Sequence, residues 1–205
     1  MPKEPKNKRA IAFFDGQNLY YAAKKAFGYP YPNYDPVALA QAICDSQGWV
    51  LEETRFYTGV PALDDLPYWH NFWSNKIRSM TRNGVIVYSR TLRYKTSTES
   101  PGTVLREEKG IDVRLALDVV RKTYNEDLDV ALIFSQDQDL SEVADEVRTF
   151  SARQKRWIKI ASAFPVSPAY SNRRGINGTD WIRIDADTYN NCIDPWDYRR
   201  SGGDN

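Results

Sequence analysis

Short segments that are apolar throughout alternate along this chain with longer segments in which apolar residues recur every three or four positions. Strands that are apolar along their whole length are typical of parallel sheets, because helices then cover both faces of the sheet. A recurrence of three and four, as in VRLALDVV and LSEVADEVRTF, is the period of an amphipathic helix. The alternation therefore predicts one α/β domain with helices on both faces of a mostly parallel sheet.

The order of these segments predicts a domain over residues 10–195, between flexible tails at 1–9 and 196–205. Two irregular segments, 90–109 and 167–180, interrupt the alternation, and the first is a polar loop with room for a hairpin. Strands are expected at 10–14, 53–58, 84–89, 129–134, 157–162 and 181–185, and helices at about 17–27, 36–47, 67–82, 112–125, 139–153 and 186–192.

The composition excludes several classes of protein. No apolar run approaches the roughly 20 residues of a membrane helix, and the first apolar stretch, AIAFF, is too short for a signal peptide. A cytoplasmic protein without membrane association is therefore expected. Cys44 and Cys192 have no zinc-site spacing, and His70 is the single histidine, which excludes catalysis by two histidines. The net charge of +1 gives no overall basic signature for nucleic acid, although a local patch fits such a total.

Acidic residues stand where predicted strands end and helices begin. Asp15 follows the first strand, Asp137 and Asp139 follow the fourth, and Asp112 opens the helix before the fourth. Each can be a helix cap, and Asp139 with Glu142 fits a capping box. Capping alone does not explain why Asp139 has a second acid, Asp137, beside it. It also does not explain why three acidic sites fall at the same edge of the predicted sheet. Ligands of parallel α/β sheets bind at the carboxyl ends of the strands, so these side chains are expected to converge there.

Converging carboxylates repel one another unless a cation compensates their charge. Mg²⁺ and Mn²⁺ prefer carboxylate and water oxygens, and such a site promotes hydrolysis of phosphate esters without a histidine. Asp118 lies six residues beyond Asp112, which is about 9 Å along the helix and roughly 120° around it. The geometry therefore favours Asp112 as the ligand and leaves Asp118 as a supporting acid or a surface residue.

Three motifs, FFDGQNLY, KGIDVRLALDVV and ALIFSQDQDLSEV, follow one another in this order. Together they resemble the NYN domain, a branch of the PIN-like nuclease superfamily, over residues 10 to about 162. The resemblance implies a three-layer α/β/α sandwich of the PIN-like kind and a Mg²⁺- or Mn²⁺-dependent ribonuclease. The acids that it implies as catalytic residues and metal ligands are Asp15, Asp112, Asp137 and Asp139.

The resemblance also implies roles for residues beside the acids. Asn18 is expected to orient a carboxylate or the scissile phosphate, Lys109 to contact a phosphate, and Asp118 to match the family's further acid. A solvated lysine before a helix is an equally good interpretation of Lys109. The sequence departs from the family pattern S-G-D-x-D at Gln136, which is bulkier than glycine and is expected to narrow the approach to Asp137.

Single-stranded RNA is usually bound by positive charge along its backbone and by aromatic faces beneath its bases. Arg93 in the first irregular segment and Arg173 in the second are the expected substrate-binding residues. Tyr20 and Tyr21 are further candidates, although packing in the core is the favoured interpretation for both. The aromatic segment LPYWHNFWSNKI is predicted to be a buried helix face, with a homodimer interface as the next alternative. Other loop candidates are Arg90, Tyr94, Lys95 and Arg174.

Two other functions remain open from the sequence. A non-catalytic module that keeps the fold and binds RNA or a protein is one alternative, and Gln136 and the lack of a basic stripe favour it. A phosphatase of the haloacid dehalogenase type is the other, but that family carries a second Asp where this chain has Gln17. The expected substrate of a nuclease is single-stranded or structured RNA, and single-stranded DNA also remains open.

Overall fold

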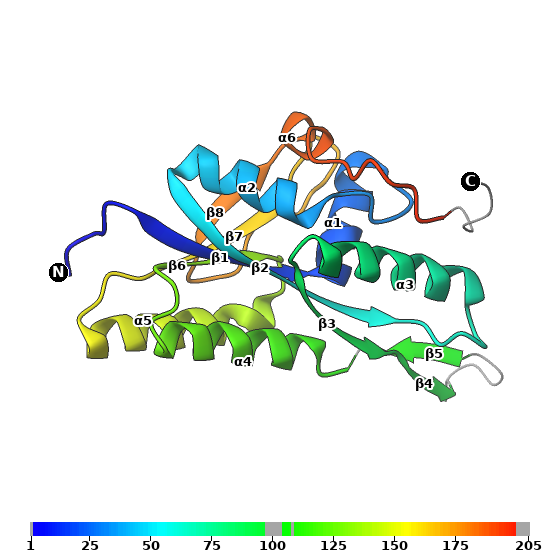
Figure 1. Cartoon of the computed structure of the whole chain (residues 1–205), viewed down its shortest axis with the longest axis horizontal. Helices are drawn as coiled ribbons and strands as arrows, with labels where there is room; N and C mark the ends of the chain where they lie inside the picture. Colours follow the sequence, from blue (N-terminus) through cyan, green and yellow to red (C-terminus); the bar gives the residue numbers. More distant parts are fainter. Residues whose placement is uncertain (1, 97–103, 108, 200–205) are drawn as a thin grey trace.

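Six parallel strands form the central sheet, in the order β3-β2-β1-β6-β7-β8 (Figure 1). The computed structural model describes residues 2–96, 104–107 and 109–199, so parts of the predicted loop (97–103 and 108) and of the predicted C-terminal tail (200–205) lie outside the described residues. The strands are β1 (Lys8–Asp15), β2 (Trp49–Val60), β3 (Ile86–Thr91), β6 (Val130–Phe134), β7 (Lys159–Pro165) and β8 (Asp180–Ile184).

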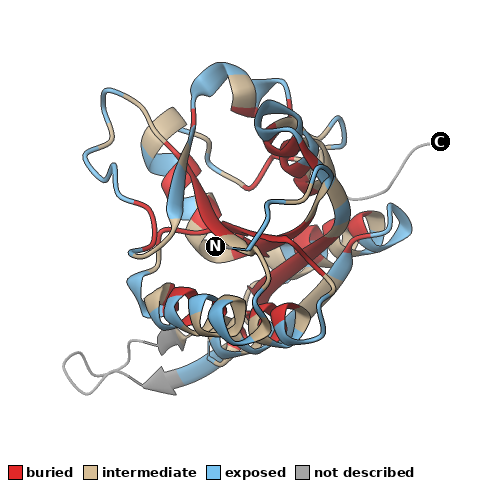
Figure 2. Cartoon of the chain, turned by 90° about the vertical axis from the view of Figure 1, so that its left-hand side faces the viewer, coloured by how far each residue is buried: buried red, intermediate tan, exposed pale blue. Residues whose placement is uncertain are grey.

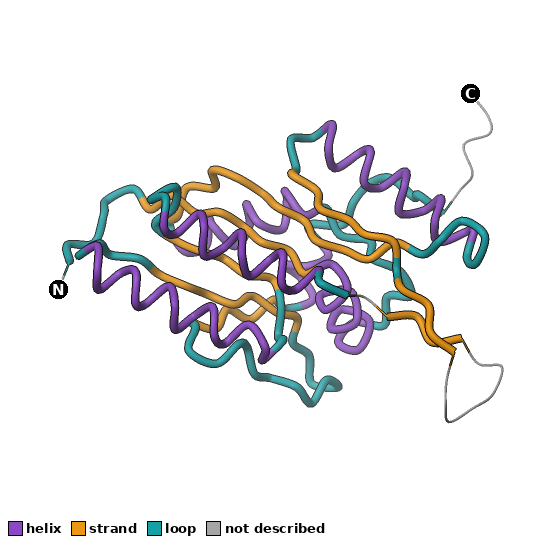
Figure 3. Tube along the Cα trace, turned by 90° about the horizontal axis from the view of Figure 1, so that it is seen from below, coloured by secondary structure: helices purple, strands orange, loops and turns teal. Residues whose placement is uncertain are grey.

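Helices cover both faces of this sheet, which confirms the predicted α/β/α sandwich. Figure 3 shows α4 and α5 running side by side across one face. Within the described residues, no helix has the length and apolar character needed to cross a bilayer. One face carries α1 (Gly16–Phe27), α2 (Pro36–Gln47), α3 (Pro67–Arg82) and α6 (Ala186–Asn190), and the other carries α4 (Ile111–Tyr124) and α5 (Ser141–Gln154), with the 3₁₀ turn η1 (Gln138–Leu140) before α5.

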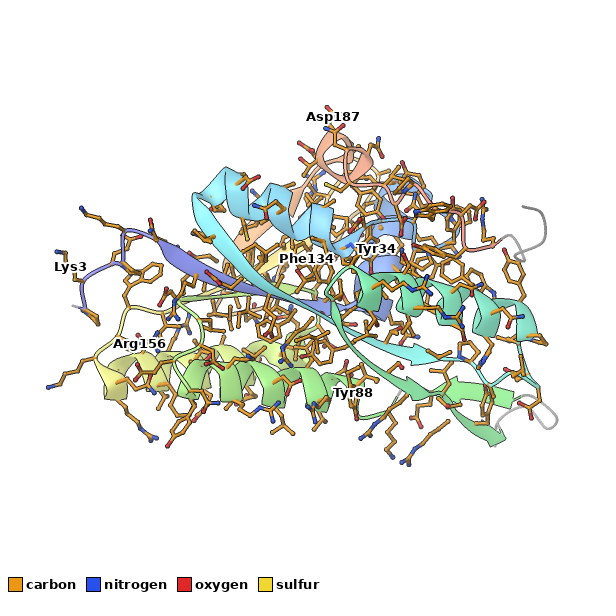
Figure 4. The ribbon with its side chains drawn as sticks, in the orientation of Figure 1. Lys3, Tyr34, Tyr88, Phe134, Arg156 and Asp187 are labelled. Atoms are coloured by element: carbon orange, nitrogen blue, oxygen red, sulfur yellow. The ribbon has the colours of Figure 1, made fainter. Side chains whose placement is uncertain are left out.

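The middle strands are buried on both faces, as their apolar sequences predict (Figure 2). On the α1 side the core is aromatic, and the rings of Phe14 and Phe134 stack with centroids 3.9 Å apart. On the α4 side the core is largely aliphatic, built around Leu115 and Val119. Figure 4 shows Tyr34 and Phe134 on the first side and Tyr88 on the second.

The chain changes direction across the sheet at β1. From β1 it proceeds to β2 and β3 on one side, and later returns to place β6, β7 and β8 on the other side. Phe14 at the end of β1 pairs with Phe134 at the end of β6, so the carboxyl ends of these two strands are neighbours. This is the topological switch point, where open α/β sheets bind their ligands.

Several predicted boundaries differ from the observed ones by a few residues, those of β1 and β2 among them. β1 begins at Lys8 rather than at residue 10, because the backbone N–H and the guanidinium of Arg9 both donate to the carboxylate of Asp129. β2 extends beyond 53–58 at both ends, because pairing with β1 on one side and β3 on the other continues along its length. The predicted hairpin is present as the antiparallel pair β4 (Arg93–Thr96) and β5 (Val104–Glu107).

A buried ion pair holds the C-terminal segment against α3. The Lys76 side chain is fully buried, and its Nζ donates to the backbone oxygen of Tyr34 at 2.9 Å and to Asp194 at 3.0 Å. The Tyr198 ring lies 5.1 Å from the same Nζ and contacts Phe72 edge to face. The described part of the predicted C-terminal tail therefore packs on the domain. Phe72 and Lys76 also confirm that the aromatic segment forms a buried helix face.

We expect Asp194→Ala to lower the free energy of unfolding by about 3 kcal/mol or more, because it leaves the Lys76 ammonium buried without its partner. Burial lowers the pKa of Lys76, and Asp194 opposes this effect. The loss of unfolding free energy in Asp194→Ala is therefore greater at pH 7 than at pH 9.5. At the higher pH a larger fraction of Lys76 is the neutral amine, which is less costly to bury. Urea unfolding at both pH values measures this, with exposed Asp64→Ala as the control. A pH-independent loss would contradict the buried charge as its cause.

Candidate metal centre

Three carboxylates meet at the switch point of the sheet. Asp15 is the last residue of β1, Asp137 follows β6, and Asp112 lies in the first turn of α4. Each offers one oxygen, and the three oxygens lie within 4.8 Å of one another. The structure therefore brings together three of the four acids expected to converge, and hard carboxylate oxygens at this spacing could hold a divalent metal ion.

Asp15 is the most buried of the three acids, with 3% of its surface exposed. One carboxylate oxygen accepts the backbone N–H of Asn18 at 3.1 Å and so caps α1, while the other accepts the hydroxyl of Ser135 at 2.9 Å. Burial raises the pKa of Asp15 to about 7, the charges of Asp112 and Asp137 add to the rise, and the two hydrogen bonds oppose it. Asp15 is thus both a helix cap and a member of the acidic group.

Asp137 is fixed by the turn that follows β6. Its backbone N–H donates to the Ser135 hydroxyl at 3.1 Å, and its carboxylate accepts the backbone N–H of Asp139 at 3.0 Å as the cap of η1. The hydroxyl of Ser135 therefore links Asp15 to Asp137. Asp112 is half-buried and makes no side-chain cap of α4, and burial, followed by the charges of Asp137 and Asp139, raises its pKa.

Asp139 lies outside the three-acid group of the described residues, although its charge is close enough to raise the pKa of Asp112. Its side chain is exposed. The capping box with Glu142 is absent: Asp137 provides the cap, because a 3₁₀ turn intervenes before α5, and the first turn of α5 has no side-chain cap. Neither helix capping nor the three-acid group thus accounts for the Asp139 carboxylate.

Asp118 belongs to a different network. It is 2% exposed, so the expectation of a surface residue is wrong. The helical rotation carries it away from Asp112 and towards β2, where its carboxylate accepts four side-chain donors. Every oxygen is thereby occupied by the protein, and Asp118 stabilises the packing of α4 on the sheet. The donors are Arg55 (3.0 Å), the hydroxyl of Tyr57 (2.9 Å), Arg114 (3.1 Å) and Arg121 (2.7 Å).

Gln136 was expected to narrow the approach to Asp137, but its side chain does not extend over the acids. Its side chain is buried and donates to the backbone oxygen of Arg174 at 2.8 Å, and it accepts the hydroxyl of Tyr170 at 3.2 Å. Gln138 similarly donates to the backbone oxygen of Gly175 at 3.0 Å and accepts the backbone N–H of Asn177 at 3.2 Å. The two glutamines of SQDQD therefore hold the irregular segment 167–180 beside the acidic group.

Asn18 joins α1 to the same turn. Its side-chain oxygen accepts the backbone N–H of Gln136 at 2.9 Å, and its own backbone N–H binds Asp15. Asn18 thus positions both strand ends of the site, in agreement with an orienting role. Ser135 and Gln138 were not anticipated from the sequence. The only sequence signal for them is the unbroken polar run that follows a fully apolar strand.

The expected substrate-binding cations all have exposed side chains. Lys109 is exposed three residues before Asp112, Arg93 is exposed at the start of β4, and Arg173 is exposed in the segment held by Gln136. Among the described residues, none of the three forms an ion pair with Asp15, Asp112 or Asp137. All three remain predictions as RNA contacts.

Comparisons with known proteins agree with this fold. The family model of the NYN domain matches residues 9–168. The crystal structure of a protein of unknown function from Vibrio parahaemolyticus is similar, with a TM-score of 0.56 and 18% sequence identity, over 90% of this chain and 98% of that one. At this identity the likeness shows the fold alone. The sequence has no significant match among curated proteins.

We expect the stability of the metal-free protein to depend on pH through Asp15. Its folded pKa of about 7 lies above an unfolded value of roughly 4, so the folded state binds more protons between these values. Stability from this group therefore falls as the pH rises from 5 to 8. Relative to wild type, Asp15→Asn gains stability over that range, as urea unfolding in EDTA would measure. The exposed Asp145→Asn is the control, and a difference that does not change with pH would contradict the raised pKa.

Gln136→Ala is expected to loosen segment 167–180 without unfolding the domain, because it removes the buried amide bonds to this segment. Hydrogen exchange at the amides of Ile176 and Asn177 should accelerate about tenfold or more, because two buried hydrogen bonds of roughly 1 kcal/mol each are lost. Exposed Gln41→Ala, which loses a bond to Asp45, is the control. Unchanged exchange in the segment would show that Gln136 does not anchor it.

Proposed function

The chain belongs to the NYN domain family, and we propose that it is a Mg²⁺- or Mn²⁺-dependent ribonuclease that hydrolyses phosphodiester bonds of RNA. The observation that carries this proposal is the meeting of the Asp15, Asp112 and Asp137 oxygens within 4.8 Å at the switch point. Carboxylates this close disfavour one another's ionised form, and burial raises the pKa of Asp15 further. A divalent cation relieves both effects.

The donor set fits a hard cation. Asp15, Asp112 and Asp137 would hold it, and Asn18 and Ser135 fix the carboxylate of Asp15 in the orientation that a ligand needs. When bound, such an ion lowers the pKa of a water molecule and neutralises charge on the transferring phosphoryl group. Asp139, exposed beside Asp112, is suited to orient water at the open side of the site.

The chain's own cations would hold the substrate. Lys109 lies just before α4, Arg93 begins β4, and Arg173 is presented by the segment that Gln136 anchors. Phosphate contacts from cations on separate elements fix the register of a nucleic-acid backbone. We propose that these three residues contact the RNA backbone on either side of the scissile phosphate.

The alternative of a non-catalytic binding module rested in part on Gln136. Because the Gln136 side chain is directed into segment 167–180, its bulk does not argue against catalysis. Gln17, which stands where a haloacid dehalogenase phosphatase has its general acid, lines a pocket with aromatic residues and provides no carboxylate. The ribonuclease proposal therefore accounts for more of the site.

We expect purified wild-type protein to cleave a mixed-sequence single-stranded RNA in Mg²⁺ or Mn²⁺ and not in EDTA. Asp137→Asn should reduce the rate by about 100-fold or more, since even residues that only orient metal ligands contribute 10- to 100-fold. Asp145→Asn, an exposed acid of α5, should cleave like wild type. A single-stranded DNA of the same sequence shows whether the 2′-hydroxyl is needed.

A folded wild type that binds RNA but cleaves it in neither metal would support the binding module instead. Cleavage that persists in EDTA, or in Asp137→Asn, would indicate a contaminating nuclease.

A further inference from the structure

An aromatic pocket of about 310 Å³ opens beside the acidic group. It lies between the exposed face of α1, the carboxyl end of β2 and the first turns of α3. None of the metal-site carboxylates lines it, and the mechanism above leaves it unused. This cavity is called the Tyr21 pocket, and the residues that line it include Gln17, Tyr20, Tyr21, Lys24, Thr58 and Trp69.

The Tyr21 pocket shares two elements with the acidic group. Its α1 wall is formed by Gln17, Tyr20, Tyr21 and Lys24, which have the spacing of one helix face. The same helix begins at the cap residue Asp15. The β2 wall begins at Thr58, directly after the residue that pairs with Asp15 in the sheet, and paired strands lie about 4.8 Å apart. Residues adjacent in sequence to Asp15 and to its strand partner therefore lead directly into the pocket walls.

The pocket walls have the chemistry of a base-stacking site. Tyr21 is 49% exposed, and its ring lies 5.2 Å from that of Tyr20. The Tyr20 hydroxyl donates to the backbone oxygen of Pro30 at 2.8 Å, which fixes this ring without closing the pocket. Trp69 is partly exposed and faces the pocket from α3. Aromatic faces of this kind bind bases of any sequence, because every base has a π-face.

The charge at the far end suits a phosphate. Lys24 is exposed and its Nζ lies 6.0 Å from the Tyr20 ring centroid. From Gln17 to Lys24 the helix rises about 10 Å. If the scissile phosphate of an RNA strand lies at the acids, the next feature along α1 is the aromatic pocket. Beyond the pocket, Lys24 can contact a neighbouring phosphate of the same RNA. Continuity with the acidic group and this order of charges favour a nucleic acid over a peptide.

We propose that the Tyr21 pocket binds one unpaired nucleobase of the RNA strand, stacked against Tyr21 and Trp69, with a neighbouring phosphate on Lys24. This inference rests on the proposed function, since it places the strand relative to the same acids. A volume of about 310 Å³ is large enough for one nucleobase. Bases of duplex RNA are stacked inside the helix, so the pocket selects single-stranded segments at the cleavage site.

Binding is measured in the Asp137→Asn background, so that cleavage does not remove the ligand. The probe is a short RNA that carries 2-aminopurine, whose fluorescence falls on stacking, and a series of the same RNA with one abasic position each. The pocket variant is Tyr21→Ala, and Tyr21→Phe keeps the ring. The control is Tyr124→Ala, an exposed tyrosine at the other end of α4 from Asp112.

Tyr21→Ala should weaken RNA binding about 5- to 100-fold, the range for loss of one stacked base, while Tyr21→Phe and Tyr124→Ala bind like the parent. One abasic position should weaken binding by the parent by a similar or larger factor and weaken binding by Tyr21→Ala less, because both changes remove the contact with Tyr21 while Trp69 remains. Quenching of 2-aminopurine at that position should be reduced in Tyr21→Ala. Duplex RNA should bind no better to the parent than to Tyr21→Ala.

Three results would each overturn the proposal that the pocket binds a base. They are equal RNA binding by Tyr21→Ala and its parent, an equal abasic effect in both proteins, and an absence of RNA binding. Failure of the ribonuclease proposal looks different. In that case wild type would not cleave in either metal, yet the abasic effect and its reduction in Tyr21→Ala would remain. If wild type cleaves RNA and Tyr21→Ala binds it as tightly as the parent does, the ribonuclease proposal stands and the proposed nucleobase pocket is rejected.

Discussion

The buried carboxylate of Asp15 is the interaction on which the arrangement of the site depends. It ends the central strand, caps α1 and accepts a hydroxyl from the turn after β6, so it ties together the three elements that meet at the switch point. Two hydrogen bonds do not fully offset its burial, and its pKa is raised to about 7. The fold thus holds a carboxylate in place while leaving its charge to be compensated by another group. A site built for a cation requires both properties.

The segment SQDQD shows how the fold separates two tasks within five residues. Ser135 and Asp137 face the acids, whereas Gln136 and Gln138 face the opposite way and bind segment 167–180. Asp137 still has an extended backbone, so residues 135 to 137 alternate as in a strand, whereas Gln138 begins the 3₁₀ turn η1. A glycine at position 136 would leave the acids unchanged but would remove one anchor of the segment that carries Arg173.

The sequence predicted the sheet and the acids because both depend on local patterns. Helices 36–47 and 67–82 were predicted to the residue, and each begins with proline in its first turn, which starts a helix without losing a hydrogen bond. Asp15, Asp112 and Asp137 were found because strand ends of a parallel sheet share an edge. The partners of Gln136 lie 34 to 38 residues away, and Arg55 lies 63 residues from Asp118. No local pattern specifies such contacts, so the direction of Gln136 and the burial of Asp118 could not be predicted.

The residues that match the family carry the acids, but those beyond residue 168 shape the surroundings of the site. Segment 167–180 is held against Gln136 and Gln138, and the chain then continues through β8 and α6 to Asp194, which fixes Lys76 of α3. The same helix supplies Trp69 to the proposed nucleobase pocket. The position of that wall therefore depends in part on a buried ion pair whose acidic partner, Asp194, lies beyond the family match. The proposed ribonuclease site and the proposed pocket thus depend on different parts of the chain, because all of the acids lie within the match and one residue that holds the pocket wall in place does not.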